Sequence, residues 1–400
     1  MKQRKPNLLV LIIIAIIAGI FCGMFFPEFL TRFFLTFNTI FSNFLGFCIP
    51  LIILGFVAPA IGDIGVGAGK MLVITVILAY AATLGAGFLS YFMGETFFPM
   101  FLEAADKSSQ AIGEKIVIEP FFTIPMPPIL DIMSALVLSF VVGIGVTFIK
   151  TETGYLKHLM WEFRDIVSWI IGRVIVPLLP IYIFGIFLNM SQTGEVGSVL
   201  TTFYKIIIVI FVLHLVWLVI MYLIGAAFSR GNKNPFKLLW TMLPAYFTAL
   251  GTQSSAATIP VTLRQTIKMG VDEDVAGFTV PLCATIDLSG SALKIVACAL
   301  ALMITEGMPY DFGMFAYFVA MMGIALVAAP GVPGGSIMAS LGLLTSILGF
   351  SEADCALMIA LYIAMDSFGT ACNVTGDGAI SLVVDRFFGK KSPELRLLED

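Results

Sequence analysis

The stretch Asp366-Ser-Phe-Gly-Thr-Ala-Cys-Asn-Val-Thr-Gly-Asp377 places two carboxylates, an amide and three hydroxyls inside an otherwise apolar run, Ala353 to Val384. A run of this length can cross a bilayer. A charged side chain at the centre of a membrane helix costs roughly 2.5–3.5 kcal/mol or more, so such residues usually face a pathway or a ligand. The stretch therefore predicts a polar binding site inside a membrane-spanning helix.

Three other segments in the C-terminal half are interrupted in a similar way. One helix is broken at Thr285-Ile-Asp-Leu-Ser-Gly-Ser291. The segments 236–262 and 314–350 are broken at Thr252-Gln-Ser-Ser-Ala-Ala-Thr-Ile-Pro260 and at Ala329-Pro-Gly-Val-Pro-Gly-Gly-Ser336, and we expect both to be re-entrant hairpins. Two hairpins, each followed by a broken helix, are typical of an inverted repeat in a secondary transporter, with the binding site where the broken elements meet.

The composition agrees with a membrane protein. Of 400 residues, 59% are hydrophobic and only 12% are charged, which excludes an ordinary soluble domain. The net charge of −4 leaves no basic surface for nucleic acid, so the expected partners are the lipid bilayer and a small molecule. The six cysteines are scattered singly, and we interpret all of them as small hydrophobic residues.

The apolar runs predict an all-α integral membrane protein with about eight transmembrane helices and the two hairpins. The basic residues near the N-terminus, around Lys233 and near Lys390 contrast with an acidic loop, Glu95 to Glu119, so the positive-inside rule puts both termini in the cytoplasm of a multi-pass protein of the cell (inner) membrane. The eight runs are Asn7–Phe26, Phe34–Ile61, Met71–Met93, Ile129–Ile149, Val167–Met190, Thr201–Phe228, Val275–Ile304 and Ala353–Val384.

The two hairpin tips carry different chemistry. Ser254 and Ser255 supply hydroxyls beside small residues that let the backbone approach a ligand, although close helix packing would explain the same residues. Prolines and the glycines Gly331, Gly334 and Gly335 prevent a continuous helix in the second tip and expose carbonyls that can bind a cation. A kinked helix is the alternative for the second tip.

Three carboxylates lie deep in apolar segments, those of Asp287, Asp366 and Asp377, and the nearby basic candidates are only Lys294 and Arg173. Some negative charge is therefore left for a transported cation or an ammonium group. Lys294 follows Asp287 by seven residues, so it neutralises Asp287, extends outward to the interface, or provides a fixed positive charge near the substrate.

Nothing in the sequence favours an enzyme. Neither histidine accompanies a nucleophile or metal ligands, and the sequence lacks the G-x-S-x-G, HExxH and P-loop motifs. Without a P-loop, ATP-driven transport is disfavoured. An ion channel remains a more remote alternative to a gated carrier.

The chain resembles the dicarboxylate/amino acid:cation symporters, the glutamate transporter family, over nearly its whole length. The segments that carry the resemblance are Ser254-Ser-Ala-Ala-Thr-Ile-Pro260, Gly331-Val-Pro-Gly-Gly335 and Asn373-Val-Thr-Gly-Asp377. The resemblance implies a homotrimer and an elevator mechanism. It further implies a scaffold formed mostly by residues 1–230, a transport core at 231–390 that the third and sixth helices join, and a cytoplasmic tail at 391–400.

The resemblance also implies roles for individual residues. Asp366 would hold the substrate ammonium and Asn373 its α-carboxylate. The wider set of expected substrate-binding residues is Ser254, Ser255, Ser291, Gly331, Val332, Asp366, Gly369, Thr370 and Asn373.

Sodium is the implied coupling ion, with protons as an alternative or addition. One ion would lie between Asp377 and the carbonyls of Cys283, Asp287 and Asn373. A second would use the carbonyls of Thr285, Leu288, Leu326, Val327 and Ala329. The segment Asp287-Leu-Ser-Gly-Ser291 departs from the family's Asn-Met-Asp-Gly-Thr, so a third ion would need Asp287 and Ser289, with partners such as Tyr80 and Thr83.

A second departure concerns the substrate. Members that carry acidic amino acids have an arginine three residues after the ammonium-binding aspartate, where this chain has Gly369. An acidic side chain would lose its bidentate partner, so sodium-coupled symport of a small neutral amino acid, such as serine, threonine or alanine, is expected. The Lys294 ammonium keeps an acidic amino acid or a C4-dicarboxylate as the alternative. Some resemblance to the serine/threonine symporter branch favours the neutral substrate.

Overall fold

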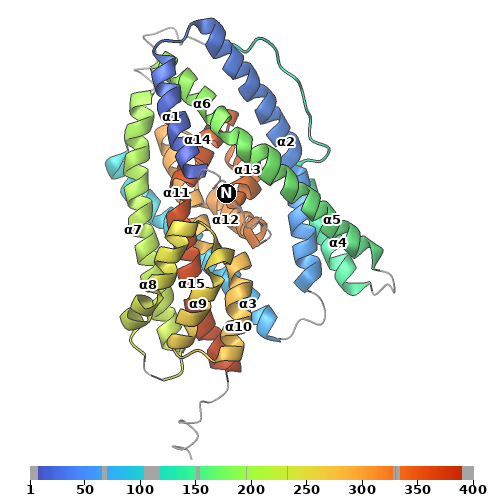
Figure 1. Ribbon diagram of the computed structural model, residues 1–400, viewed down its shortest axis with the longest axis vertical. Helices are drawn as coiled ribbons and strands as arrows, with labels where there is room; N and C mark the ends of the chain where they lie inside the picture. Colours follow the sequence, from blue (N-terminus) through green and yellow to red (C-terminus); the bar gives the residue numbers. More distant parts are fainter. Residues whose placement is uncertain are drawn as a thin grey trace, which may run out of the picture.

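The computed structural model describes residues 8–64, 70–102, 118–149, 154–194, 196–231, 233–327, 329 and 334–389. Within these ranges every regular element is a helix, and most of the helices run roughly along the long axis of the molecule (Figure 1). The predicted all-helical class is confirmed. All six cysteines are free thiols, and five are buried, in agreement with their interpretation as small apolar residues.

One group of helices comes from the N-terminal half. Helix α1 packs against α6, and α2 packs against α4 and α5. A π-helical turn joins α5 to α6, and Gly194, with φ of 80°, ends α6. The bounds are α1 Leu8–Gly23, α2 Glu28–Ile64, α4 Ile132–Phe148, α5 Tyr155–Ile170, the π turn Ile171–Ile175 and α6 Val176–Thr193.

Residues 118–131 form an extended segment that runs along α2, and we call this segment the strap (Figure 1). The Arg32 side chain donates to the Glu119 carbonyl at 3.0 Å. Asn43 donates to the Ile124 carbonyl at 2.8 Å. These bonds satisfy backbone groups that have no helical partner, and they fasten the strap to α2.

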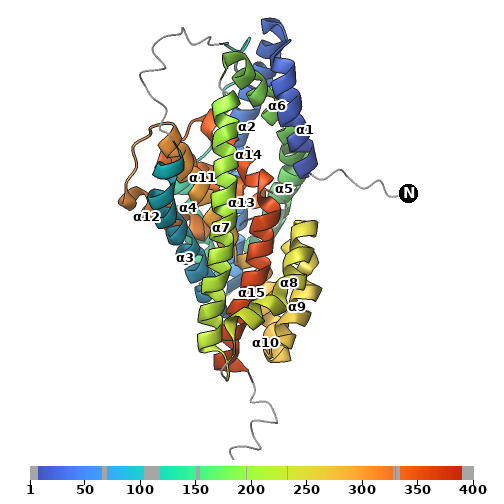
Figure 2. The same cartoon turned by 90° about the vertical axis from the view of Figure 1, so that its left-hand side faces the viewer.

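The other group contains α3, Lys70–Phe101, α7, Val196–Phe228, and every helix from α8 onward. Helices α11 and α15 are buried almost from end to end and form the centre of this group. Helices α8, α9 and α10 pack beside α15 (Figure 2). The bounds are α8 Pro235–Thr252, α9 Ser255–Lys268, α10 Glu273–Ile286, α11 Ser289–Thr305, α12 Phe312–Val327, α13 Gly335–Leu348, α14 Glu352–Ala364 and α15 Asp366–Phe388.

Two long helices from the N-terminal half are bonded to this centre. Ser90 of α3 donates to the Leu293 carbonyl of α11 at 2.7 Å. Tyr222 of α7 donates to the Thr375 carbonyl of α15 at 2.9 Å. Both bonds lie in a low-dielectric interior and connect α3 and α7 to the helices that carry the candidate site.

Five helical stretches among the described residues are long and apolar enough to cross a membrane, and α14 with α15 adds a sixth as a pair bent by 62°. The eight predicted runs all correspond to helices, but α1 and α4 are shorter apolar helices of 16 and 17 residues. The pairs α8–α9 and α12–α13 pack as the two predicted hairpins. The long stretches are Glu28–Pro59, Lys70–Met100, Tyr155–Thr193, Phe203–Phe228 and Glu273–Thr305.

Candidate functional site

The break between α8 and α9 forms because two residues leave the helical conformation. Gln253 has φ of 53°, a left-handed conformation that is uncommon outside glycine. Ser254 caps α9 by accepting the Ala257 N–H at 3.2 Å. The Gln253 amide donates to the Ser367 hydroxyl at 2.6 Å, which connects this tip to the first turn of α15.

The break between α10 and α11 is closed by a residue from another helix. Helix α11 has no side-chain cap of its own at Leu288. Asn373 of α15 provides one, because its Oδ1 atom accepts the N–H groups of Gly290 at 2.8 Å and Ser291 at 3.3 Å. The amide oxygen of Asn373 is thus used within the protein, and its Nδ2 atom lies 3.3 Å from the Ser291 hydroxyl.

The remaining two breaks meet at Asp366. Helix α14 ends at Ala364, and Asp366 begins α15 at the 62° bend. Gly334, with φ of 77°, precedes α13 and donates its N–H to Asp366 Oδ2 at 3.2 Å. Asp366 therefore contacts the second hairpin directly. The predicted substrate residues Gly331 and Val332 lie outside the described residues.

All four breaks border one cavity of about 90 Å³. The first turns of α9, α11, α13 and α15 contribute to its wall, and so do the last turns of α10 and α14, so helix ends of both polarities border the cavity. It contains six of the predicted substrate residues, Ser254, Ser255, Ser291, Asp366, Thr370 and Asn373, together with Gln253, Ala256, Ala284, Thr285, Leu288, Ala329, Ser336 and Tyr362.

Lys294 pairs with Asp366 and is fully buried. Its ammonium lies 2.8 Å from Asp366 Oδ1, 3.4 Å from the Tyr362 carbonyl and 3.3 Å from the centre of the Tyr362 ring. The interpretation in which Lys294 neutralises Asp287 is wrong, and so is the one in which it extends outward. The third interpretation, a fixed positive charge next to the site, matches this position.

Gly369 does not line the cavity but lies against Lys294. A Cβ atom at Gly369 would be 2.8 Å from the Lys294 Nζ atom and 3.0 Å from its Cε atom, closer than real Cβ contacts allow. The lysine therefore occupies the space that a side chain at position 369 would fill. The other basic candidate, Arg173, is exposed on the π-helical turn and contributes nothing to this centre.

A second set of polar side chains lies near the part of α15 that follows Asn373. Some of their oxygens have no hydrogen-bond partner. Within the described part of the chain, Asp287 Oδ2, Ser289 Oγ, Thr375 Oγ1 and Asp377 Oδ1 are buried and have no hydrogen-bond partner. Asp287 also lies within electrostatic range of Asp377. Buried oxygens of this kind need a donor or a cation. Asp287 and Asp377, with Ser289 next to Asp287, form what we call the oxygen cluster, and this cluster fits a hard cation such as sodium. Thr375 is two residues before Asp377, so its hydroxyl is on a different face of α15.

Two of the carbonyl oxygens that are expected to bind sodium already accept one hydrogen bond each. The Cys283 carbonyl accepts the Asp287 N–H at 2.8 Å, and the Leu326 carbonyl accepts the Ala329 N–H at 2.9 Å, which leaves one lone pair on each oxygen. Val327 ends α12. Thr285, Leu288 and Ala329 all border the 90 Å³ cavity, so the structure brings these three together.

Sequence reasoning missed Tyr362 and His214. The Tyr362 hydroxyl lies 3.1 Å from the Ser291 hydroxyl, and Tyr362 borders the cavity. His214 Nε2 lies 2.9 Å from the Gly290 carbonyl. The only sequence signal for Tyr362 is its position four residues before Asp366 in an apolar run.

The suggested third-helix partners lie away from this cavity. Tyr80 donates to the Ala320 carbonyl of α12 at 3.2 Å, and Thr83 donates to the Ala79 carbonyl of its own helix at 3.0 Å. Neither is among the cavity residues.

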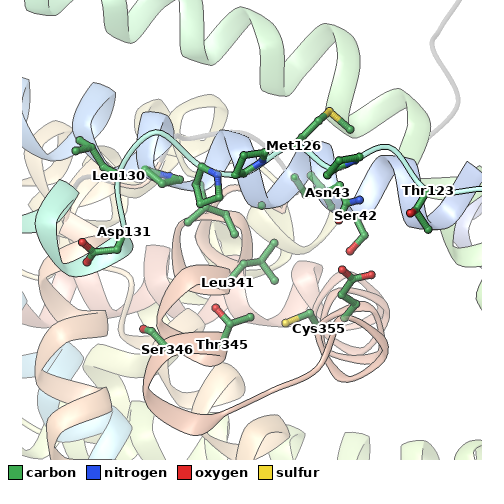
Figure 3. A pocket seen from close by; sticks show the side chains of 18 of the residues that line it. Ser42, Asn43, Thr123, Met126, Leu130, Asp131, Leu341, Thr345, Ser346 and Cys355 are labelled. Carbon is green, nitrogen blue, oxygen red and sulfur yellow. The ribbon is translucent and has the colours of Figure 1, made fainter.

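A larger cavity of about 720 Å³ lies between the two groups of helices (Figure 3). Ser42 and Asn43 of α2 and the strap form one side, and α13 and α14 form the other, with Leu341 and Cys355 facing the space. None of the predicted site residues lines it. Its wall is mostly apolar, so we do not regard it as the substrate site.

Comparisons with known proteins agree with this arrangement. The model of the sodium:dicarboxylate symporter family matches residues 8–387. The serine/threonine transporter SstT of Streptococcus thermophilus is 27% identical over 356 residues, 86% of this chain and 87% of that protein. The SstT of Streptococcus agalactiae is 29% identical over 289 residues, 70% of this chain and 69% of that protein.

A eukaryotic relative is similar over a shorter region. The excitatory amino acid transporter of Caenorhabditis elegans is 30% identical over 246 residues, 60% of this chain, and the chain spans about half the length of that relative, 48%. The family match covers nearly every described residue, including the four helix breaks and the buried carboxylates. The chain is therefore an integral membrane protein that belongs to the sodium:dicarboxylate symporter family.

Proposed function

We propose that the protein is a secondary active symporter that couples sodium entry to uptake of a small neutral amino acid, serine, threonine or alanine. The observation that carries this proposal is the Lys294–Asp366 pair, because it makes the substrate side of the site electrically neutral. A zwitterionic substrate adds no net charge there. Each relative named as SstT is a serine/threonine transporter by name, which supports the same substrate class.

The two charged groups of the amino acid have suitable partners. Asp366 borders the cavity and accepts the substrate ammonium while it keeps its bond to Lys294. The substrate α-carboxylate faces the N-terminal end of α9 at Ser255 and the Nδ2 atom of Asn373. Helix N-termini stabilise carboxylates through free N–H groups and the helix dipole.

The side chain of the substrate must be small and uncharged. Typical ligand pockets measure about 300–1,000 Å³, whereas this one is near 90 Å³. The Lys294 ammonium is buried, is bonded to Asp366 and does not line the cavity, so it does not face the space that the substrate side chain would fill. Ser291 and Thr370 supply hydroxyls for a serine or threonine side chain.

Sodium supplies the driving force in this proposal. The oxygen cluster of Asp287, Ser289 and Asp377 holds one ion, and the carbonyls at Thr285, Leu288 and Ala329 contribute to another at the cavity. Asp366 connects substrate to the second hairpin through Gly334, so closure of that hairpin depends on occupancy. Thermodynamic linkage then requires that bound sodium raise the affinity for the substrate, and that bound substrate raise the affinity for sodium by the same factor.

An elevator motion is part of the same proposal. The transport core comprises α8 to α15 with α3 and α7, which are bonded to α11 and α15. The N-terminal helices α1, α2 and α4 to α6 form the scaffold of a homotrimer. The large cavity with walls from α2 and α13 marks the boundary between these two parts.

Uptake of labelled serine into proteoliposomes tests the proposal. An inward sodium gradient should drive accumulation, and unlabelled alanine and threonine should compete while aspartate, glutamate and succinate do not. Choline in place of sodium is the control for coupling, and a protonophore tests whether protons contribute. Asp366→Ala should abolish serine binding in a folded protein.

Other outcomes point to other functions. Competition only by the acidic compounds would replace the neutral substrate with an acidic amino acid or a dicarboxylate. Uptake that does not depend on sodium but is abolished by the protonophore would show that protons, rather than sodium, are the coupling ion. Flux that neither saturates nor requires substrate would indicate a channel.

A further inference from the structure

The positive and negative charges of the buried centre are distributed unevenly. Three carboxylates, those of Asp287, Asp366 and Asp377, share one ammonium, that of Lys294. Lys294 is committed to Asp366. Asp287 and Asp377 have no basic partner among the described residues and present unpaired oxygens. One carboxylate therefore has a permanent counter-ion, and two depend on ions that arrive from outside.

The position of Lys294 differs from that of a substrate ligand. Asp366 borders the cavity, whereas Lys294 is 0% exposed and is not part of the cavity wall. The carboxylate thus lies between the cavity and the ammonium. The Tyr362 ring and carbonyl surround the ammonium, and Gly369 provides the space for it. These contacts hold the ammonium beside Asp366 without any group from a ligand in the cavity.

A symporter must return its empty site across the membrane after the substrate leaves. An unpaired carboxylate is costly in a low-dielectric interior, so the return requires either a transported cation on Asp366 or a cation that belongs to the protein. The Lys294 ammonium is such a cation. It cannot dissociate, and it stays with Asp366 after substrate release.

We infer that Lys294 is a built-in counter-ion that lets the empty carrier return without a transported cation on Asp366. Lys294 is thus a positioning and charge-compensating residue rather than a substrate ligand, and Gly369 is the second part of the device. The inference rests on the proposed symport and adds a role for Lys294 in one specific step, the return of the empty site.

Comparison of exchange with net uptake tests this step. Exchange of labelled for unlabelled serine uses only the loaded carrier, whereas net uptake also requires the empty return. Lys294→Met keeps the length of the side chain and removes its charge. We expect net uptake to fall further than exchange in this variant, so that the ratio of net uptake to exchange drops at least tenfold. Lys237→Met, an exposed lysine on α8, is the matched control and should change neither rate.

The result that overturns the inference is an equal change, or no change, in the exchange and net rates of Lys294→Met when wild type performs both. If wild type moves no serine in either assay, the proposed function fails instead. If Lys294→Met does not fold, the double variant Lys294→Ala with Gly369→Lys supplies the ammonium from α15. A wild-type ratio of net uptake to exchange in that variant supports the inference, and a ratio at least tenfold lower overturns it.

Discussion

The Oδ1 atom of Asn373 accepts the backbone N–H of Gly290 at 2.8 Å, so a residue inside α15 caps the N-terminus of α11. The two residues are 83 positions apart in the chain. The bond holds two broken helices together at the cavity and satisfies an N–H group that lies beyond the reach of water. Asn373 therefore has a structural role in addition to the substrate role proposed for it.

Removal of this cap should lower stability. Asn373→Ala leaves the N–H groups of Gly290 and Ser291 without their acceptor, which costs about 1–3 kcal/mol for a buried group. We expect a lower unfolding temperature in detergent and loss of serine uptake. Asn43→Ala, at the more exposed strap contact, should have a smaller effect on unfolding. An unfolding temperature equal to wild type for Asn373→Ala would contradict the capping role.

The oxygen cluster makes a separate prediction for sodium. Ser289→Ala removes a hydroxyl without a protein partner, so the folded protein in sodium-free buffer should remain as stable as wild type. The sodium concentration for half-maximal serine uptake should rise about tenfold, and Asp377→Asn should raise it further. Thr279→Val breaks a bond to Ser381 and should affect stability but not sodium dependence. Unchanged sodium activation in Asp377→Asn would remove the ion from this cluster.

A side chain at Gly369 should displace the end of the Lys294 side chain. In Gly369→Ala the new Cβ atom meets the lysine ammonium at 2.8 Å, so the Lys294–Asp366 pair must shift. We expect serine uptake to fall at least tenfold. Gly277→Ala is the matched control on α10, where a Cβ meets nothing within 4 Å, and helix propensity favours the alanine there by up to about 1 kcal/mol. Equal uptake by both variants would show that the pair can relax.

The larger cavity allows a test of relative motion. Ser42 of α2 and the native Cys355 of α14 border the same space (Figure 3). A flexible bismaleimide that joins Cys355 to a cysteine introduced by Ser42→Cys should arrest serine uptake, because it connects the proposed scaffold to the transport core. The same reagent on wild type should leave uptake intact. Full activity of the cross-linked protein would rule out movement between α2 and α14.

Much of the site could be predicted because helix breaks leave strong signals in sequence. Serine-rich, glycine-rich and proline-rich segments in apolar runs marked three of the breaks. The predicted interruption at 366–377 is wrong, because α15 is helical throughout that stretch and the break lies just before it, at Met365. A carboxylate in the apolar run still marked Asp366 as a site residue. The roles given to the site residues and to the domains stay predictions. The positions of the helices could be predicted better than their lengths, because α1 and α4 are apolar but short.

The partner of Lys294 could not be predicted for a clear physical reason. The seven-residue spacing from Asp287 places both on one face only if the helix is continuous. Asp287 is the C-cap residue that follows α10, with an extended ψ of 100°, and Lys294 belongs to α11. The break therefore changes the register between them. Tyr362 was missed because a single hydroxyl in an apolar helix has no distinctive pattern, and the strap has no periodicity at all.

Helix α6 ends at Thr193 and α7 begins at Val196, so Gly194 and one further residue join the proposed scaffold to the proposed core. Three residue steps span roughly 10 Å at full extension. However far the core moves, the facing ends of α6 and α7 must therefore stay within this distance of each other. Gly194, with its left-handed backbone, is a natural pivot. The short link thereby limits how α7 can move during transport: its N-terminal end stays close to α6, while its C-terminal end moves through the larger distance.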